Sequence, residues 1–226
     1  MKPRVVFSDF DGTITERDVI VMILERFGAP DWKELTQQIL DGQLSIRDGV
    51  RQLFEKIPGR YRPDIERFVE QTVEFRPGFQ GFVRQCRLQN IPLVVVSGGI
   101  DFFVEPVLRR LPPQDFAHLQ LFCNQAVFHP DRIEVLNPHQ NRDCTACLPM
   151  PAGCGCCKVG VMAAWPPTQY ERIAIGDSVT DIAMAQAADR VFARERLIDY
   201  CEHHGIACER FNTFEDIANA CFLKNY

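Results

Sequence analysis

The sequence lacks any long apolar run. No stretch approaches the roughly 18 consecutive apolar residues that a membrane-spanning helix requires. The apolar run at residues 5–7 is also far shorter than the core of a signal peptide, which takes about 7–15 residues. We therefore expect a cytoplasmic protein whose thiols are kept reduced.

An excess of basic residues is missing as well. The 25 Lys and Arg residues face 30 Asp and Glu residues, so the formal net charge is −5. This balance argues against a surface built for nucleic acid or for an anionic membrane. The chain has 226 residues, of which 46% are hydrophobic. Such a length suits one α/β core domain with a smaller accessory domain.

Three short apolar runs end in polar or glycine-rich residues, as buried parallel strands do where they open into loops. The runs cover residues 4–8, 91–96 and 172–175. Helical patterns separate them, and residues 119–128 and 133–136 add a predicted hairpin. The alternation predicts an α/β fold with a doubly wound, mostly parallel, Rossmann-like sheet. Its active site is expected at the carboxyl ends of the strands.

The first two predicted strands are separated by far more residues than one crossover helix needs. This stretch carries four segments with helical spacing of apolar residues, at 19–27, 32–41, 45–56 and 64–75. We interpret residues 16–76 as a helical cap domain. It is inserted into a catalytic core domain formed by residues 1–15 and 77–226.

Pairs of acidic residues follow two of the predicted strands. Asp9 and Asp11 come at the end of the first strand, and Asp177 and Asp181 follow the third. Carboxylates this close repel each other unless a cation or a proton lies between them, and hard oxygen ligands favour Mg²⁺. Each pair alone could also serve a turn or a helix cap. Neither alternative explains why acidic pairs recur at two strand ends.

A serine and two glycines end the second predicted strand, at Ser97-Gly98-Gly99. A hydroxyl and backbone amides at the start of a helix form a ready anion site, although a tight turn alone would also require glycine. Lys158 stands at the start of a later predicted helix. A lone lysine is usually a solvated surface charge.

Together, these four pieces resemble the haloacid dehalogenase superfamily of phosphatases. Its pattern is Asp-x-Asp-Gly-Thr, a Ser or Thr after the second strand, a downstream Lys, and Gly-Asp-x-x-x-Asp. The matching residues here are Asp9-Phe10-Asp11-Gly12-Thr13, Ser97, Lys158 and Gly176-Asp177-Ser178-Val179-Thr180-Asp181. The order agrees along the whole chain, and the helical insertion lies where the family has its first type of cap.

The resemblance implies a magnesium-dependent phosphomonoester hydrolase. Asp9 would be the nucleophile that forms an aspartyl-phosphate, and Asp11 the general acid and base. A carboxylate oxygen of Asp9, the backbone carbonyl of Asp11 and the carboxylate of Asp177 would hold Mg²⁺. Asp181 would support that site, with helix capping as its alternative role.

The resemblance also implies how the phosphate is bound. Ser97, the Gly98 amide and Lys158 would hold the phosphoryl oxygens and offset charge in the transition state. The substrate expected from this family is a small phosphorylated metabolite. Nothing in the sequence indicates the oligomeric state.

Within the superfamily, the glycine turn and the helical cap resemble the phosphoserine phosphatase branch. Longer runs resemble the methionine-salvage phosphatases of that branch, which act on a methylthio enol phosphate. These runs are Asp-Phe-Asp-Gly-Thr-Ile-Thr, Ser-Gly-Gly-Ile-Asp-Phe-Phe-Val, Cys-Gly-Cys-Cys-Lys and Ile-Gly-Asp-Ser-Val-Thr-Asp. The resemblance implies a role in methionine biosynthesis.

Phosphoserine is the alternative substrate, and the two substrates need different caps. Glu16 or Asp18 could pair with the ammonium of phosphoserine. An uncharged methylthio group would prefer apolar contacts, for which Phe102 and Phe103 are candidates. The other possible role of these two rings is to pack their helix against the hydrophobic core.

Five of the ten cysteines lie close together, at positions 144, 147, 154, 156 and 157. Cys144, Cys147, Cys154 and Cys156 resemble the ligands of a structural zinc site. The alternatives are reduced thiols that pack a tight turn and, in purified samples, a disulfide.

Proteins of other classes also use clustered carboxylates on an α/β sheet. A phosphate-accepting receiver domain would form a stable aspartyl-phosphate, but it has no inserted cap and needs no acid at Asp11. A binding protein without activity would need none of these acids. A phosphotransferase that moves phosphate to another alcohol is compatible with every motif.

Overall fold

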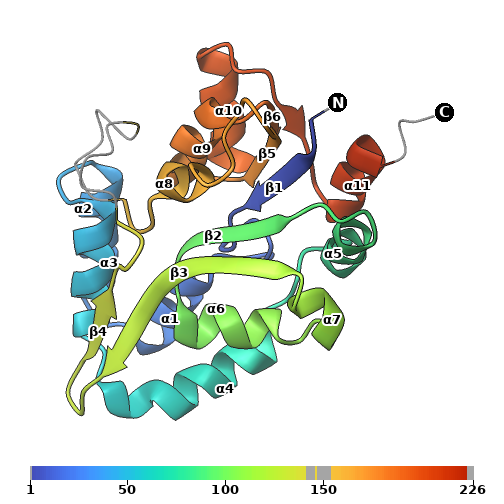
Figure 1. The fold of residues 1–226 in the computed structure, drawn as a ribbon. Helices are drawn as coiled ribbons and strands as arrows, with labels where there is room; N and C mark the ends of the chain where they lie inside the picture. The colour runs from blue at the N-terminus through green and yellow to red at the C-terminus, as the bar shows by residue number, and fades with distance from the viewer. Residues whose placement is uncertain (1, 141–145, 147–153, 223–226) are drawn as a thin grey trace.

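The computed structural model describes residues 2–140, 146 and 154–222 (Figure 1). Its centre is a seven-stranded sheet with the order β4-β3-β2-β1-β5-β6-β7. The strands are β1 Arg4–Ser8, β2 Leu93–Ile100, β3 Leu119–Phe128, β4 Ile133–Leu136, β5 Glu171–Gly176, β6 Arg190–Ala193 and β7 Glu209–Arg210. Within this sheet, the β3–β4 pair is antiparallel and the other pairs are parallel. The doubly wound, mostly parallel sheet predicted from the sequence is confirmed.

Strand β1 suits the middle of the sheet because its three central residues, 5–7, are apolar and fully buried, and Ser8 is buried as well. Its last residue, Ser8, is in register with Val95 of β2 on one side and Ile175 of β5 on the other. The loops that follow these three strands therefore meet at one edge. This is the point where the strand order reverses, and in such sheets it is where ligands bind.

The chain between β1 and β2 forms helices. These are α1 Val19–Phe27, α2 Trp32–Leu40, α3 Ile46–Glu55, η1 Gly59–Tyr61, α4 Arg62–Thr72 and, leading into β2, α5 Phe79–Leu88. Ser45 caps α3 by accepting a hydrogen bond from the Asp48 amide. Phe54 of α3 packs edge-to-face on Phe102 of the core, so the inserted helices share a hydrophobic core with the sheet. The division into two domains stays a prediction.

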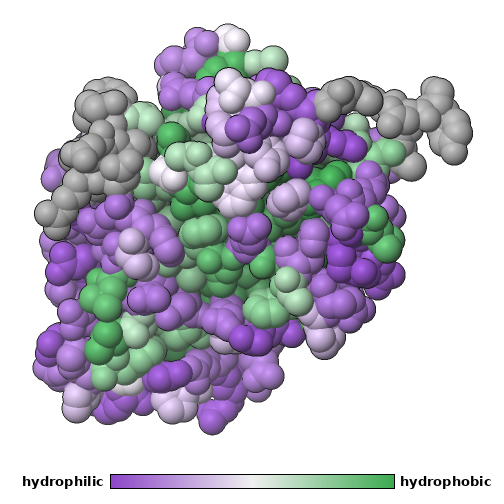
Figure 2. Space-filling model, in the orientation of Figure 1, coloured by the Kyte–Doolittle hydropathy of each residue, from purple (hydrophilic) through white to green (hydrophobic). Residues whose placement is uncertain are grey.

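The remaining helices follow β2 and cover the sheet (Figure 1). They are α6 Asp101–Leu108, α7 Pro113–Phe116, α8 Lys158–Met162, η2 Val179–Asp181, α9 Ile182–Ala187, α10 Glu195–His203 and α11 Phe214–Phe222. No helix in the described ranges is both long and apolar enough to cross a membrane. The face drawn in Figure 2 is largely hydrophilic, with apolar residues in separate patches.

Strand β2 departs from the sequence prediction. It was expected at residues 91–96, but it covers Leu93–Ile100 and continues through the two glycines. The pairing with β3 shifts register between Val96 and Ile100, so this part of β2 bulges out of the ladder. The short strands β6 and β7 were not predicted, because four and two residues are too few to show a pattern.

Candidate active site

Asp9 follows β1 directly and is only 5% exposed. The ammonium of Lys158, the first residue of α8, lies 2.6 Å from Asp9 Oδ1 and 2.5 Å from Asp181 Oδ1. Burial alone would lower the pKa of this lysine, but the two carboxylates outweigh it and hold the pKa above its usual range. Lys158 is thus a buried, paired cation, and not the solvated surface charge that a lone lysine usually is.

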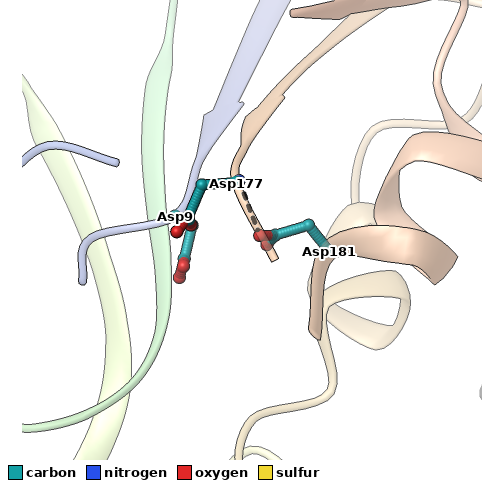
Figure 3. Close-up of side chains that lie close together, drawn as sticks. All are labelled: Asp9, Asp177 and Asp181. Carbon is teal, nitrogen blue, oxygen red and sulfur yellow. Dashed lines mark hydrogen bonds between the residues drawn. The ribbon is translucent and has the colours of Figure 1, made fainter. Parts of the chain in front are cut away.

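Three carboxylates gather beside this lysine. Oxygens of Asp9, Asp177 and Asp181 all lie within 4.8 Å of one another (Figure 3). Burial first, and then the charge of Asp181, raises the pKa of Asp9 to about 8 and that of Asp177 to about 7. Hard oxygen donors that repel each other in this way fit a bound Mg²⁺, whose charge would lower both pKa values.

Asp181 differs from the other two because both of its oxygens already have donors. One oxygen accepts from Lys158, and the other accepts from the backbone amides of Asp177 and Ser178, at 3.1 and 3.0 Å. The dashed line in Figure 3 is the hydrogen bond that the backbone amide of Asp177 donates to Asp181. Ser178 in turn caps the η2 turn, so a capping box is present. Asp181 therefore orients the loop and the lysine, while Asp9 and Asp177 have oxygens left for a cation.

The Asp11 carboxylate points elsewhere. One oxygen accepts from the backbone amide of Val19, at the start of α1, at 3.0 Å. The other accepts from the Ser97 hydroxyl at 3.3 Å. Burial, followed by the charges of Asp18 and Asp9, raises the pKa of Asp11 well above its usual range. A carboxyl group whose pKa is raised holds its proton more tightly, which suits the role of a general acid.

The glycine turn lies directly against this acid. Ser97 is fully buried, and its hydroxyl accepts from the Gly99 amide at 2.8 Å. A Cβ on Gly99 would come within 2.8 Å of Asp11 Oδ2, so the turn needs glycine there for close approach. The structure thus brings together Asp9, Asp11, Ser97, Lys158, Asp177 and Asp181, six of the residues that the motifs indicated.

Residues 6–186 match the haloacid dehalogenase-like hydrolase family. The chain belongs to that family. It is 42% identical to a protein of Brevibacillus brevis over 96% of this chain and 94% of the relative. It is also 42% identical to a protein of Bacillus cereus over 94% and 93%. Both relatives are named 2-hydroxy-3-keto-5-methylthiopentenyl-1-phosphate phosphatase. The family resemblance and the prediction of a hydrolase are confirmed.

Solved structures support the fold of this hydrolase. A substrate-bound phosphoserine phosphatase superposes with a TM-score of 0.69 at 16% identity, covering 97% of this chain and 99% of that one. A phospho-aspartyl intermediate analogue of phosphoserine phosphatase superposes with a TM-score of 0.67 at 17% identity, with the same coverage. At this level of identity, the likeness concerns the fold alone.

Sequence reasoning gave no role to Thr13 and missed Arg76. The Thr13 hydroxyl donates to Asp177 Oδ1 at 2.9 Å and so connects the first and last motifs of the hydrolase. Arg76 is 6% exposed and donates to the backbone carbonyls of Gly12 and Thr13, at 2.7 and 2.8 Å. The role of Thr13 could have been inferred from its place in the first motif, but no sequence pattern indicates a role for Arg76.

The two candidate acids in the cap have different surroundings. Asp18 caps α1 by accepting from the Val21 amide at 2.9 Å, and its charge contributes to the raised pKa of Asp11. Glu16 is exposed in the linker that precedes α1. Of the candidate apolar contacts, Phe103 is fully buried in the core and Phe102 is nearly so. Packing is therefore the role of Phe103.

The predicted zinc site gains no support from the described residues. Cys144 and Cys147 lie outside them. Burial raises the pKa of Cys156 to about 12, which disfavours the thiolate that zinc requires. Cys157 instead caps α8, where its sulfur accepts from the Gly160 amide. No disulfide joins any of the cysteines that the structure describes.

Proposed function

We propose that this hydrolase removes phosphate from 2-hydroxy-3-keto-5-methylthiopentenyl-1-phosphate, as a cytoplasmic enzyme of methionine salvage. The pairing of buried Asp9 with Lys158 carries the chemistry of the proposal. Similarity to the named relatives along nearly the whole chain supports the substrate. The proposed cofactor is Mg²⁺.

In the first step, a carboxylate oxygen of Asp9 attacks phosphorus and the bond from phosphorus to the substrate oxygen breaks. Asp11 gives its proton to the departing oxygen. Ser97, the Gly98 amide and Lys158 hold the other phosphoryl oxygens. Bound Mg²⁺ would supply positive charge that offsets the charge of the phosphoryl group.

In the second step, the Asp11 carboxylate takes a proton from water, whose oxygen attacks phosphorus. The bond between phosphorus and Asp9 breaks, which releases inorganic phosphate and restores the nucleophile. The predicted cap, residues 16–76, would shield this intermediate and open for release. Its two linkers meet in an antiparallel bridge between Thr15 and Phe75.

Phosphoserine is the second candidate substrate, and the position of Asp18 favours it. This acid is exposed at the entry to the cap and lies close enough to Asp11 to raise its pKa. A carboxylate there could pair with a substrate ammonium. The methylthio enol phosphate carries no cation and would not need that pairing.

Hydrolysis of a small panel of phosphate esters tests both candidates. The purified protein would be assayed with Mg²⁺ against the enol phosphate, phosphoserine and p-nitrophenyl phosphate, and with EDTA as the control. We expect the highest kcat/KM for the enol phosphate and loss of turnover in EDTA. A preference for phosphoserine that disappears in Asp18→Asn would establish the second candidate. Turnover that survives EDTA would contradict the magnesium-dependent mechanism.

A further inference from the structure

Asn124 is a buried amide in β3 that the proposed chemistry does not use. Its side chain is only 1% exposed, and Nδ2 donates to the backbone carbonyl of Gly98 at 2.7 Å. Burying an amide costs free energy unless its polar groups are paired. The partner of this amide is the middle residue of the Ser97-Gly98-Gly99 turn, which we call the phosphate turn because the proposed function binds phosphate there.

The bulge in β2 explains why Gly98 needs a partner from a side chain. Val96 is in register with Phe122, and Ile100 is in register with Asn124. A longer segment of β2 is therefore matched to a shorter segment of β3, and the glycines between them leave the regular ladder. Asn124 gives Gly98 the donor that the interrupted ladder does not supply.

The peptide between Gly98 and Gly99 is consequently held at both ends. Its carbonyl accepts from Asn124, and its N–H donates to Ser97 Oγ at 2.8 Å. Glycine backbones are intrinsically free to rotate, because no Cβ restricts them. These two hydrogen bonds therefore fix the orientation of the Gly98–Gly99 peptide and so restrain the turn to which the Gly98 amide belongs.

A second amide extends the contact to the lysine. Asn137 Nδ2 donates to Asn124 Oδ1 at 2.8 Å and to the carbonyl of Gly155 at 3.1 Å. Gly155 packs on the turn, since a Cβ there would lie 3.5 Å from the Gly98 Cα. The segment with Gly155 leads directly into Lys158 and α8. The phosphate turn and the lysine are thus connected through two side-chain amides.

We propose that Asn124 and Asn137 are positioning residues that align the Gly98 turn with Lys158 for one phosphoryl group. The inference rests on the proposed function, because that function places phosphate between these elements. The hydrogen bonds have a fixed direction: the Gly98 carbonyl can only accept, so Asn124 must present its NH₂ group. The Asn124 oxygen then requires a donor, which Asn137 provides.

Asn124→Asp tests the first amide without changing its shape. The substitution puts a carboxylate oxygen against the Gly98 carbonyl in place of a donor. An unpaired buried carbonyl costs about 1–3 kcal/mol, which corresponds to about 5- to 150-fold in an equilibrium constant. We expect KM, and the Kd of inorganic phosphate measured by calorimetry with Mg²⁺, to rise by a factor in this range. Asn137→Asp should shift both in the same direction but less, because Asn137 is only half-buried.

Asp115→Asn is the matched control. Asp115 is fully buried in α7 and pairs with Arg87 at 2.7 Å, but it takes no part in the phosphate turn. This exchange of carboxylate for amide should lower Tm and leave both KM and the phosphate Kd unchanged. A merely structural role for Asn124 would give the same result as this control.

Wild-type phosphate affinity in both Asn variants would overturn the inference. If Asn124→Asp fails to fold, Asn137→Asp decides the matter by its phosphate Kd. Failure of the proposed function looks different. In that case the wild type binds phosphate without hydrolysing the enol phosphate, and the affinities of the variants still decide the role of the amides.

Discussion

The ammonium of Lys158 bridges two buried carboxylates, 2.6 Å from Asp9 and 2.5 Å from Asp181. This one cation compensates the proposed nucleophile Asp9 on one side, and on the other side Asp181, whose second oxygen orients the loop after β5. Breaking a buried ion pair by removing one partner is strongly destabilising, because it leaves charge uncompensated. The lysine therefore stabilises the fold in addition to its proposed catalytic role, and a single substitution can test both.

Lys158→Met should lower stability and turnover at once. We expect a loss of about 3–5 kcal/mol in the free energy of unfolding, from the uncompensated carboxylates. We also expect kcat to fall by about 10²–10³, because a donor to the phosphoryl oxygens is gone. Denaturant unfolding and steady-state kinetics measure the two effects. Unchanged stability with normal kcat would show that the pair is unimportant.

Asp9→Asn should abolish turnover because an amide cannot form the aspartyl-phosphate. Its effect on stability should differ from that of Lys158→Met, because Lys158 keeps Asp181 as its partner when Asp9 loses its charge. Burial raises the pKa of Asp9 to about 8, so the ionised side chain is costly in the metal-free fold. Metal-free Asp9→Asn should melt at the wild-type temperature or above it. Residual wild-type activity in this variant would rule out Asp9 as the nucleophile.

The raised pKa values of Asp9 and Asp177 predict how stability depends on pH. Both carboxyls bind their protons more tightly in the folded state than at the ordinary value of 3.8. Between pH 4 and about 8 the folded state holds more protons, so the metal-free protein loses stability as pH rises. Melting curves in EDTA from pH 5.5 to 8 should show Tm falling.

Saturating Mg²⁺ should weaken this fall, because the cation favours the ionised carboxylates. Asp177→Asn in EDTA should show a shallower dependence than the wild type, since one of the two groups is removed. A Tm that rises through this pH range in EDTA would contradict the crowded carboxylate cluster.

The motif residues could be found from the sequence because parallel strands bring them together. Asp9 and Asp177 follow adjacent strands, so their places at the strand ends already imply proximity. Arg76 and Asn124 could not be found in this way. Their partners are backbone carbonyls far away in the sequence, and a carbonyl leaves no mark in the residue pattern. The bulge in β2 was missed because a shift of register between two strands likewise leaves no mark in the residue pattern.

Gly12→Ala should impair the metal site. Gly12 has a φ of 74°, and a Cβ there would lie 2.5 Å from Asp177 Oδ2. The substitution strains the backbone and pushes a proposed metal ligand aside, so the concentration of Mg²⁺ needed for half-maximal activity should rise. Gly81→Ala is the control, because nothing lies within 4 Å of its Cβ position in α5. It should raise stability by about 0.5–1 kcal/mol and leave the Mg²⁺ requirement unchanged.

Arg76→Lys should loosen the connection between the end of the predicted cap and the loop that follows Asp11. The buried guanidinium donates to the carbonyls of Gly12, Thr13 and Thr15, at 2.7, 2.8 and 3.1 Å. An ammonium keeps the charge but lacks the planar fork that reaches several acceptors at once. At least one buried carbonyl then loses its donor, which costs about 1–3 kcal/mol. For a chain of this size, each kcal/mol lowers Tm by about 2–4 °C.

The same substitution should reduce kcat below the temperature at which the variant melts, because the loosened carbonyls belong to the loop that follows Asp11. Arg17→Lys is the matched control: this arginine is exposed and pairs only with Glu25 among the described residues. It should change neither Tm nor kcat. Should Arg76→Lys behave like Arg17→Lys in both measurements, the buried guanidinium does not hold the loop in place.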